Sequence, residues 1–502
     1  MLLFCLIYIF FVAFECISHH MPSAIGPLDG RKARRKRCNA CVRRKIKCHG
    51  GIPCDYCRRM KQTCESPTLP TTFAPVFVGE NANGNPRGKQ IVHTATERTG
   101  FSFLRFTAPT MYDSSVPYFF MSFLAMNNLS NDRLPVVADL VNLMADAPAL
   151  RDAISAVAVH HRKQQSPEAV PLDGYQALQS YGRSIRHVKD LITSKTFLHD
   201  PSALWTTFFL GLFELMRDST GTTWLSHFLH GTCAMLKLLE PETLSRAGPR
   251  NSHRRIFFLQ TRIFEISRSL IYSSPTFLWD AKWTAAIANL WDGDSAALWH
   301  PKEALFDLLP SFSELSICVL QFALNETQLP PMVHHNLAQS LADEGFALQE
   351  KLQGWYEETQ SWEQMCKADQ ASSISTSWPD TELMIGYAYY HAINIYLSGT
   401  YDYHKPWTGP GAPRAPILTR DEIDLHVSRI LHHSRSLLAH GISGIILFFP
   451  LRVAGARAID LSLRQEILSL FQLTSQRGFV VAEALVDDLL ELWGSKNYHF
   501  FN

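Results

Sequence analysis

Six of the eleven cysteines lie within one short segment near the N-terminus of the chain. Two residues and then six separate successive cysteines, this pattern occurs twice, and five residues join the two repeats. The six are Cys38, Cys41, Cys48, Cys54, Cys57 and Cys64. A segment of about 27 residues cannot bury an apolar core large enough to fold alone, so bound metal must supply much of its folding free energy.

The cysteine spacing predicts a pair of zinc ions. Thiolates are soft ligands that suit tetrahedral Zn²⁺, and two residues between cysteines let both sulfurs reach one ion. Two tetrahedral ions ordinarily need eight ligands, so six cysteines suffice only if two sulfurs bridge, and the repeat suggests one bridge from each half. Sulfur then fills every position, so the two Zn²⁺ ions are structural rather than catalytic.

Three other readings of the cysteines were weighed. A disulfide framework needs an oxidising compartment, and only the first 20 residues favour one. A purely structural zinc knob would not need thirteen basic residues around it. An iron–sulfur site usually takes four cysteines, which this double repeat does not suggest.

Charge is distributed very unevenly along the chain. Residues 31–64 contain 13 of the 47 Lys and Arg residues and a single acidic residue, Asp55, which gives a balance of +12. The remaining 468 residues have a balance of −11, so the net charge of +1 hides a strongly basic module on a mildly acidic body. This asymmetry indicates a polyanionic partner for the module.

Residues 38–64 resemble the fungal Zn2Cys6 binuclear cluster. They match it in every spacing, in the basic run after the second cysteine, and in Pro53 of the central loop. The resemblance implies that the first and fourth cysteines, Cys38 and Cys54, bridge the ions. It assigns Cys41 and Cys48 to one ion, and Cys57 and Cys64 to the other.

The resemblance also implies how double-stranded DNA is read. A short helix that begins near Cys38 would enter the major groove, where Arg44 and Lys45 would contact the bases of a CGG-like half-site. Val42 departs from the Arg that many family members have there, which removes one phosphate contact. We assign five other basic residues to phosphates: Arg43, Lys47, Arg58, Arg59 and Lys61.

A run of six positive charges precedes the first cysteine. We expect it to act as a nuclear import signal and as an arm that contacts the DNA backbone. Its charged residues are Arg31, Lys32, Arg34, Arg35, Lys36 and Arg37.

The N-terminus conflicts with a nuclear location. Met1–Phe14 is an unbroken apolar run, shorter than a membrane span, without a preceding Lys or Arg and without a clear cleavage site. Met21 is an alternative start, and residues 1–20 would then be an artefact of the gene model. A true signal would instead make the chain a secreted or membrane-anchored cysteine-rich protein.

The rest of the chain reads as a linker and an all-α body. We divide the chain into an N-terminal segment (1–30), the zinc module with its arm (31–66), a linker (67–100) and a large helical regulatory domain (101–502). Helical patterns occur at Pro148–His161, 172–193, 201–217, 222–239, 252–272, 335–359, 380–398, 421–440 and 457–495. Pro241, Pro249, Pro275 and Pro310 are expected to separate them. The linker lacks the heptads of a coiled coil, so a monomer and a homodimer formed through the helical body both stay open.

The helical body resembles the fungal-specific transcription factor domain in three segments: Ala147–Arg162, Gly211–Gly231 and Phe264–Leu278. The likeness implies a regulatory role, with transcription coregulators as partners and no membrane. Phe208, Phe209, Phe213 and Met216 are expected in the core, and Val486–Trp493 is expected to form a packed terminal helix rather than an activation motif.

No enzyme is expected, because the catalytic motifs of common enzyme classes do not occur in a convincing context. Histidine pairs such as His227 and His230 are assigned to packing or the surface rather than to metal. The prediction is a nuclear, sequence-specific regulator of RNA polymerase II transcription that acts as an activator. An enzyme with an appended zinc module is the other alternative.

Overall fold

The computed structural model describes residues 111–129, 136–166, 172–244, 249–291, 299–324, 330–370 and 380–499, with Ala296 and, further towards the N-terminus, Cys57, Arg59 and Met60. The chain divides into a small unit, Phe14–Phe106, and a large unit that contains Thr107–Asn502. The large unit is all-α over its described residues, which confirms the predicted fold class for this part of the chain.

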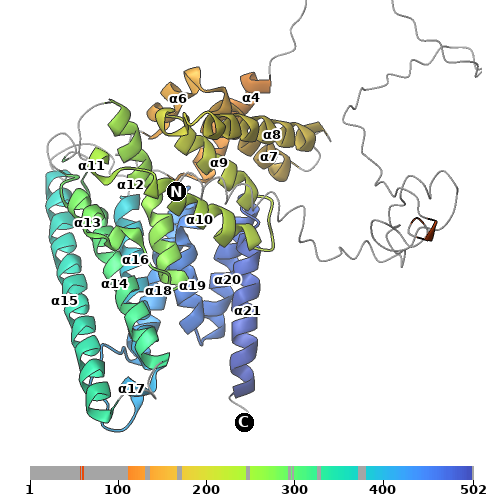
Figure 1. Ribbon diagram of the computed structural model, residues 1–502. Coiled ribbons are helices and arrows are strands. Elements are labelled where there is room, and N and C mark those ends of the chain that lie inside the picture. The colour runs from red at the N-terminus through yellow and green to blue at the C-terminus, as the bar shows by residue number, and fades with distance from the viewer. Residues whose placement is uncertain are drawn as a thin grey trace, which may run out of the picture. The chain divides into compact units, whose positions relative to one another are not determined.

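The helices of the large unit follow one another with short connections (Figure 1). The first part contains α4 (Met111–Tyr118), η1 (Phe119–Phe123), α5 (Leu124–Met126), α6 (Val136–Asp146), α7 (Pro148–Gln165), α8 (Leu172–Thr193), η2 (Phe197–His199) and α9 (Ala203–Leu215). The middle part contains η3 (Trp224–Leu229), α10 (His230–Lys237), α11 (Pro241–Leu244), α12 (Pro249–Ile271), η4 (Phe277–Trp279), α13 (Ala281–Ala288), α14 (Pro301–Leu324) and α15 (Pro331–Gln370). The last part contains α16 (Thr381–Asp402), α17 (Lys405–Thr408), α18 (Arg420–Ala439), η7 (Gly444–Leu447), α19 (Phe448–Arg457), α20 (Leu461–Gln476) and α21 (Ala482–His499).

Most of the predicted helical segments are found, several with nearly the predicted bounds. Two details were wrong. The segment 457–495 is two helices, because Gly478 adopts φ +110°, a conformation open mainly to glycine, and turns the chain between α20 and α21. Pro310 does not separate helices but lies buried inside α14, where the packing of Phe306, Leu309 and Phe312 outweighs the lost backbone hydrogen bond.

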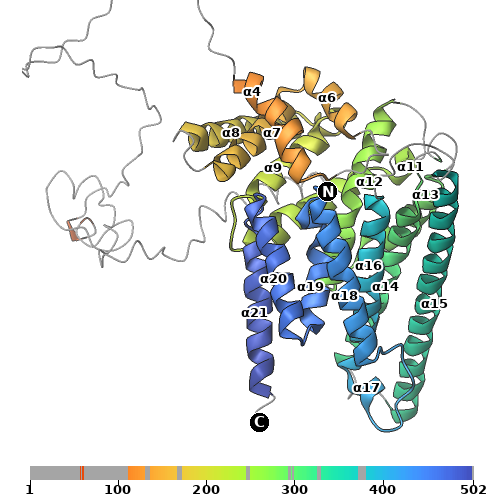
Figure 2. The same cartoon turned by 180° about the vertical axis from the view of Figure 1, so that it is seen from behind.

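The large unit has two groups of helices. In both views α4 and α6–α8 lie together at one end, and the long helices α12, α14–α16 and α18–α21 run away from them side by side (Figures 1 and 2). In the first group α7 packs against α8 and α9, and ten of its side chains from Ala149 to Val159 are buried. In the second group α16 packs against α14, α18 and α19. A helix buried on most sides forms the centre of each group.

Residues at the beginning of the large unit are bonded to residues near its end. The backbone N–H of Asn128 donates to Gly441 O at 2.8 Å, and Ser443 N–H donates to Asn128 O at 2.9 Å. This parallel bridge is isolated, and no strand occurs in the described ranges. The Gln165 side chain also donates to Gln476 O at 2.7 Å. The two ends of the domain therefore close on each other.

A buried network of charges joins α12, α14 and α16. Arg262 on α12 donates to Glu303 Oε2 at 2.6 Å, and Lys302 Nζ lies 2.9 Å from carboxylate oxygens of both Glu303 and Glu382. All four side chains are less than a tenth exposed. Burial alone would raise the pKa of Glu303, but the charges of Lys302 and Arg262 outweigh burial and hold the pKa below its ordinary value. The network therefore stays ionised around neutral pH.

Among the described helices, α14 alone is long and apolar enough to cross a membrane by length and composition. Half of its most apolar stretch is buried in the protein, and the helix packs against α12, α15 and α16. It also carries the buried Lys302 and Glu303. These contacts are those of a core helix.

A row of histidines lies between α16 and α18. His391 Nδ1 is 2.9 Å from His426 Nδ1, and the His391 and His433 rings stack with centroids 6.0 Å apart. Burial, with smaller effects of nearby positive groups, lowers the pKa of His391 to about 2 and that of His433 to about 4. These imidazoles are therefore neutral at pH 7.

Candidate functional site

Two residues of the cysteine module that were predicted as functional lie within the described part of the chain. Cys57 is helical and fully buried, whereas Arg59 is helical and exposed. A metal ligand and a phosphate contact require those two orientations, but their roles stay predictions. The other five cysteines, Arg44, Lys45, the remaining phosphate-contact residues and the arm Arg31–Arg37 lie outside the described residues.

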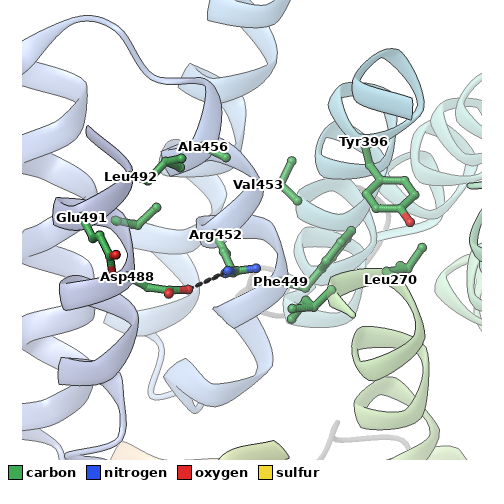
Figure 3. Close-up of a pocket in the computed structure, with 11 residues that line it drawn as sticks. Leu270, Tyr396, Phe449, Arg452, Val453, Ala456, Asp488, Glu491 and Leu492 are labelled. Carbon is green, nitrogen blue, oxygen red and sulfur yellow. Dashed lines mark hydrogen bonds and ion pairs between the residues drawn. The ribbon is translucent and has the colours of Figure 1, made fainter. Parts of the chain in front are cut away.

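The largest cavity described in the helical domain follows one face of α19. Phe449, Arg452, Val453 and Ala456 recur at the spacing that puts side chains on one face of a helix, and they line a cavity of about 500 Å³. Leu270 and Ile271 of α12, Tyr396 of α16, and Asp488, Leu489, Glu491 and Leu492 of α21 line the rest of it. Figure 3 shows these side chains on the surrounding helices. The volume is within the range of small-molecule sites.

A second cavity of about 280 Å³ continues along the same helices. It shares Tyr396, Val453 and Ala456 with the first, so the two meet between α16 and α19. Polar groups are more frequent in its lining: Ser273, Ser316, Thr400, Tyr403, His404 and Arg457. The two cavities together, called the α19 site below, are apolar in the middle and polar at both ends.

The charged groups of the α19 site are paired within the protein. Arg452 donates to Asp488 Oδ2 at 2.6 Å across the first cavity, and this pair joins α19 to α21 (Figure 3). Arg457 pairs with Asp402 at the far end of the second cavity. Burial alone would lower the pKa of Arg457, but its hydrogen bond to Asp402 and the neighbouring charges raise it, so the guanidinium stays charged.

Two hydrogen-bond donors in the α19 site have no acceptor. The Tyr396 hydroxyl lies near Ser273 and Ser316 but makes no hydrogen bond of normal geometry, and Arg457 Nη1 likewise has no partner. Burial raises the pKa of Tyr396, so the hydroxyl keeps its proton. Buried polar groups are nearly always paired in folded proteins, so two unpaired donors in one site indicate a missing acceptor.

Ser273 has an unusual backbone conformation at the edge of the second cavity. Its φ is +45°, and Ser274 N–H donates to Ser269 O at 3.1 Å, which closes the C-terminus of α12. Glycine is the usual residue in this position because it has no Cβ to clash. A serine there places its side chain at the cavity at some cost in stability.

The segments that carry the family resemblance serve packing instead. Glu214 accepts from the Tyr181 hydroxyl and lies 2.8 Å from His227 Nδ1. Glu265 accepts from Arg268 at 2.8 Å and from Thr276 at 2.8 Å, with all three buried. These bonds fix the ends of α9 and α12 relative to their neighbours.

Two expectations about the core are confirmed. The aromatic and methionine residues of α9 and its end are buried: Phe208, Phe209, Phe213 and Met216. Val486–Trp493 lies in α21, where Leu489 and Trp493 are buried, so it is a packed helix. No group of three or more metal-ligating side chains occurs among the described residues, which include His227 and His230.

The comparison with known proteins gives one family. Residues 116–497 match the model of the fungal specific transcription factor domain, which is three quarters of the chain. The chain belongs to this family. The fungal transcription factor domain makes the chain a regulator of transcription, and its family is not one of enzymes. No curated protein and no solved structure matches the chain.

Sequence reasoning did not single out the α19 site. The fungal transcription factor domain has long helices in which a pocket residue and a core residue are equally apolar, so Phe449 and Val453 carry no signal of their own. The one available signal is the apolar face of α19, at 449, 452, 453 and 456, which is too short to separate from core packing.

Proposed function

We propose that the chain is a zinc-dependent, sequence-specific DNA-binding activator of RNA polymerase II transcription that works in the nucleus. Six cysteines, from Cys38 to Cys64, would hold two structural Zn²⁺ ions. Arg44 and Lys45 would read a CGG-like half-site, and the phosphate-contact residues named above would set the position on double-stranded DNA. The helical domain would recruit coregulators.

One observation carries the proposal. A doubled C-x2-C-x6-C pattern lies within a segment of balance +12, on a chain whose remaining part belongs to a family of transcription factors. The pattern supplies a metal-stabilised fold, and the charge supplies affinity for the phosphate backbone. The buried Cys57 and exposed Arg59 agree with that arrangement.

Native mass spectrometry and DNA binding test the zinc module together. The full chain should carry two Zn²⁺ ions, and Cys38→Ala or Cys54→Ala should lose both, because each removes a bridging ligand. The same variants should lose specific binding to a CGG-containing duplex. A variant of either bridging cysteine that keeps two ions would contradict the bridging assignment.

Two lysines separate base contact from phosphate contact. Lys45→Ala should lower the affinity for a CGG duplex by about 5- to 150-fold, which corresponds to 1–3 kcal/mol, and should abolish the preference over a scrambled duplex. Lys61→Ala should weaken binding to both duplexes equally and reduce the salt slope by about one. Equal behaviour of the two variants would refute the division between them.

The basic arm carries the proposed location. A fluorescent fusion in a fungal cell should concentrate in the nucleus, and replacing the six charged residues of Arg31–Arg37 by Gln should spread it into the cytosol. A fusion that enters the secretory pathway would favour the alternative of a secreted or anchored protein.

A further inference from the structure

We propose that the α19 site binds an uncharged, elongated and mostly apolar small molecule that carries an oxygen acceptor at one end. The proposal stands independently of whether the N-terminal module binds DNA, because every residue that carries it lies in the helical domain.

The dimensions of the site fit an elongated ligand. The lining of α19 runs from Phe449 to Arg457, which corresponds to roughly 12 Å along a helix axis. The two cavities of about 500 and 280 Å³ share Tyr396, Val453 and Ala456, so one molecule can extend through both. The volume is that of a small-molecule site and is too small for a docked helix, which is about 10 Å wide with its side chains.

The charges of the site disfavour an ionic ligand. Both arginines that line it, Arg452 and Arg457, already face a carboxylate, of Asp488 and Asp402 respectively. An anionic ligand would therefore gain little attraction and would have to approach those carboxylates and Glu491. A cation would have to lose its hydration against the apolar centre, where Phe449, Val453 and Leu489 lie. An uncharged molecule meets neither cost.

The unpaired donors determine where the ligand needs an oxygen. The Tyr396 hydroxyl and Arg457 Nη1 both line the second cavity, and both are buried without an acceptor. Neither group can accept in its place, since the guanidinium has no lone pair available. A carbonyl or ether oxygen of the ligand would satisfy at least one of them, and the apolar remainder would lie along Phe449 and Leu489 in the first cavity.

The position of the site suits a regulatory ligand. Its walls come from the end of α12, from α16, α19 and α21, and from Ser316 and Leu320 of α14. A molecule in the site would contact five helices that otherwise meet only at their edges there. Binding would therefore stabilise one arrangement of these helices over others.

Nile red is the probe for the test, because it is uncharged, planar and mostly apolar and has one ring carbonyl. The full-length protein should bind it saturably, with a blue shift and an increase in its fluorescence. Ala456→Trp fills the point where the cavities meet and should weaken binding by roughly tenfold or more. Ala347→Trp, on an exposed face of α15, makes the same change outside the site and should bind as the wild type does.

Tyr396→Phe tests the acceptor without disturbing the packing. It removes a hydroxyl that has no partner, so the melting temperature should stay equal or rise, whereas Nile red affinity should fall about fivefold. This variant also decides the question if Ala456→Trp fails to fold. The anionic dye 1-anilinonaphthalene-8-sulfonate should bind the same site more weakly than Nile red.

Three results would overturn the proposal. They are the absence of saturable Nile red binding, equal binding by Ala456→Trp and the wild type, and stronger competition at the site by the anionic dye. An unchanged affinity in Tyr396→Phe would refute the assignment of the acceptor.

Discussion

Replacing Lys302 by methionine should destabilise the helical domain strongly. Lys302 Nζ lies 2.9 Å from oxygens of both Glu303 and Glu382, and it is almost fully buried. Burial alone would lower the pKa of Lys302, but the two glutamates outweigh burial and raise it, so the side chain is charged at pH 7. Methionine has a similar length but leaves both carboxylates without this cation.

The expected loss follows from breaking a buried ion pair from one side. Such a change costs about 3–5 kcal/mol, because an uncompensated charge stays buried. The unfolding entropy is about 2.1 cal/mol/K per residue, or roughly 0.8 kcal/mol/K for a unit of about 400 residues. A loss of about 4 kcal/mol then lowers the melting temperature by roughly 5 °C.

The double variant Lys302→Met with Glu382→Gln separates charge from packing. It removes the unpaired carboxylate on α16, while Glu303 keeps its bond of 2.6 Å from Arg262. Thermal unfolding followed by circular dichroism should show that the double variant recovers more than half of the loss. A single variant within about 1 kcal/mol of the wild type, or a double variant no better than the single one, would refute the reasoning.

Three further predictions concern pH, backbone strain and metal. The folded protein keeps His391 neutral, its pKa being lowered to about 2 mainly by burial, whereas the unfolded chain takes up the proton near pH 6.5. Stability is therefore complete above pH 6.5 and falls as pH decreases, by about 2 kcal/mol at pH 5, and a His391→Gln variant whose melting temperature falls equally between pH 7 and 5 would contradict this. Ser273→Gly and Lys195→Gly each relieve a positive φ, of 45° and 59°, and should each stabilise the protein by about 0.5–1 kcal/mol in urea titrations, additively because the sites are independent. A chelator should abolish DNA binding but leave the helical circular dichroism signal nearly unchanged, and a collapse of that signal would show that the helical domain depends on zinc.

The sequence predicted the all-α class and most helices because amphipathic periodicity is a local signal. The bounds 172–193 of α8 agree with the periodic pattern, and Pro148 begins α7 as expected. The misplaced helix ends have tertiary causes. Pro310 stays in α14 because buried neighbours hold it there, and only the fold shows that Gly478 must turn with φ +110°.

The two candidate sites differ in how far sequence alone reaches. A cysteine spacing is itself the coordination pattern of a metal, so the zinc module can be predicted without a structure. The α19 site combines Ser273, Tyr396, Arg457 and Asp488, which are separated by long stretches of chain and meet only through helix packing. No pattern within one helix marks them.

The bridge between Asn128 and Ile442 has a consequence for synthesis of the protein. Roughly 300 residues separate its two sides, which the ribosome needs about 15–60 s to add. During that interval the first helices have emerged, but their partners near Gly441, Ser443 and Gln476 do not yet exist. The nascent domain would expose apolar surface throughout this time and would be a natural client for chaperones. Deletion from either end would recreate that incomplete state permanently, so truncated chains would report misfolding rather than the location of a regulatory segment.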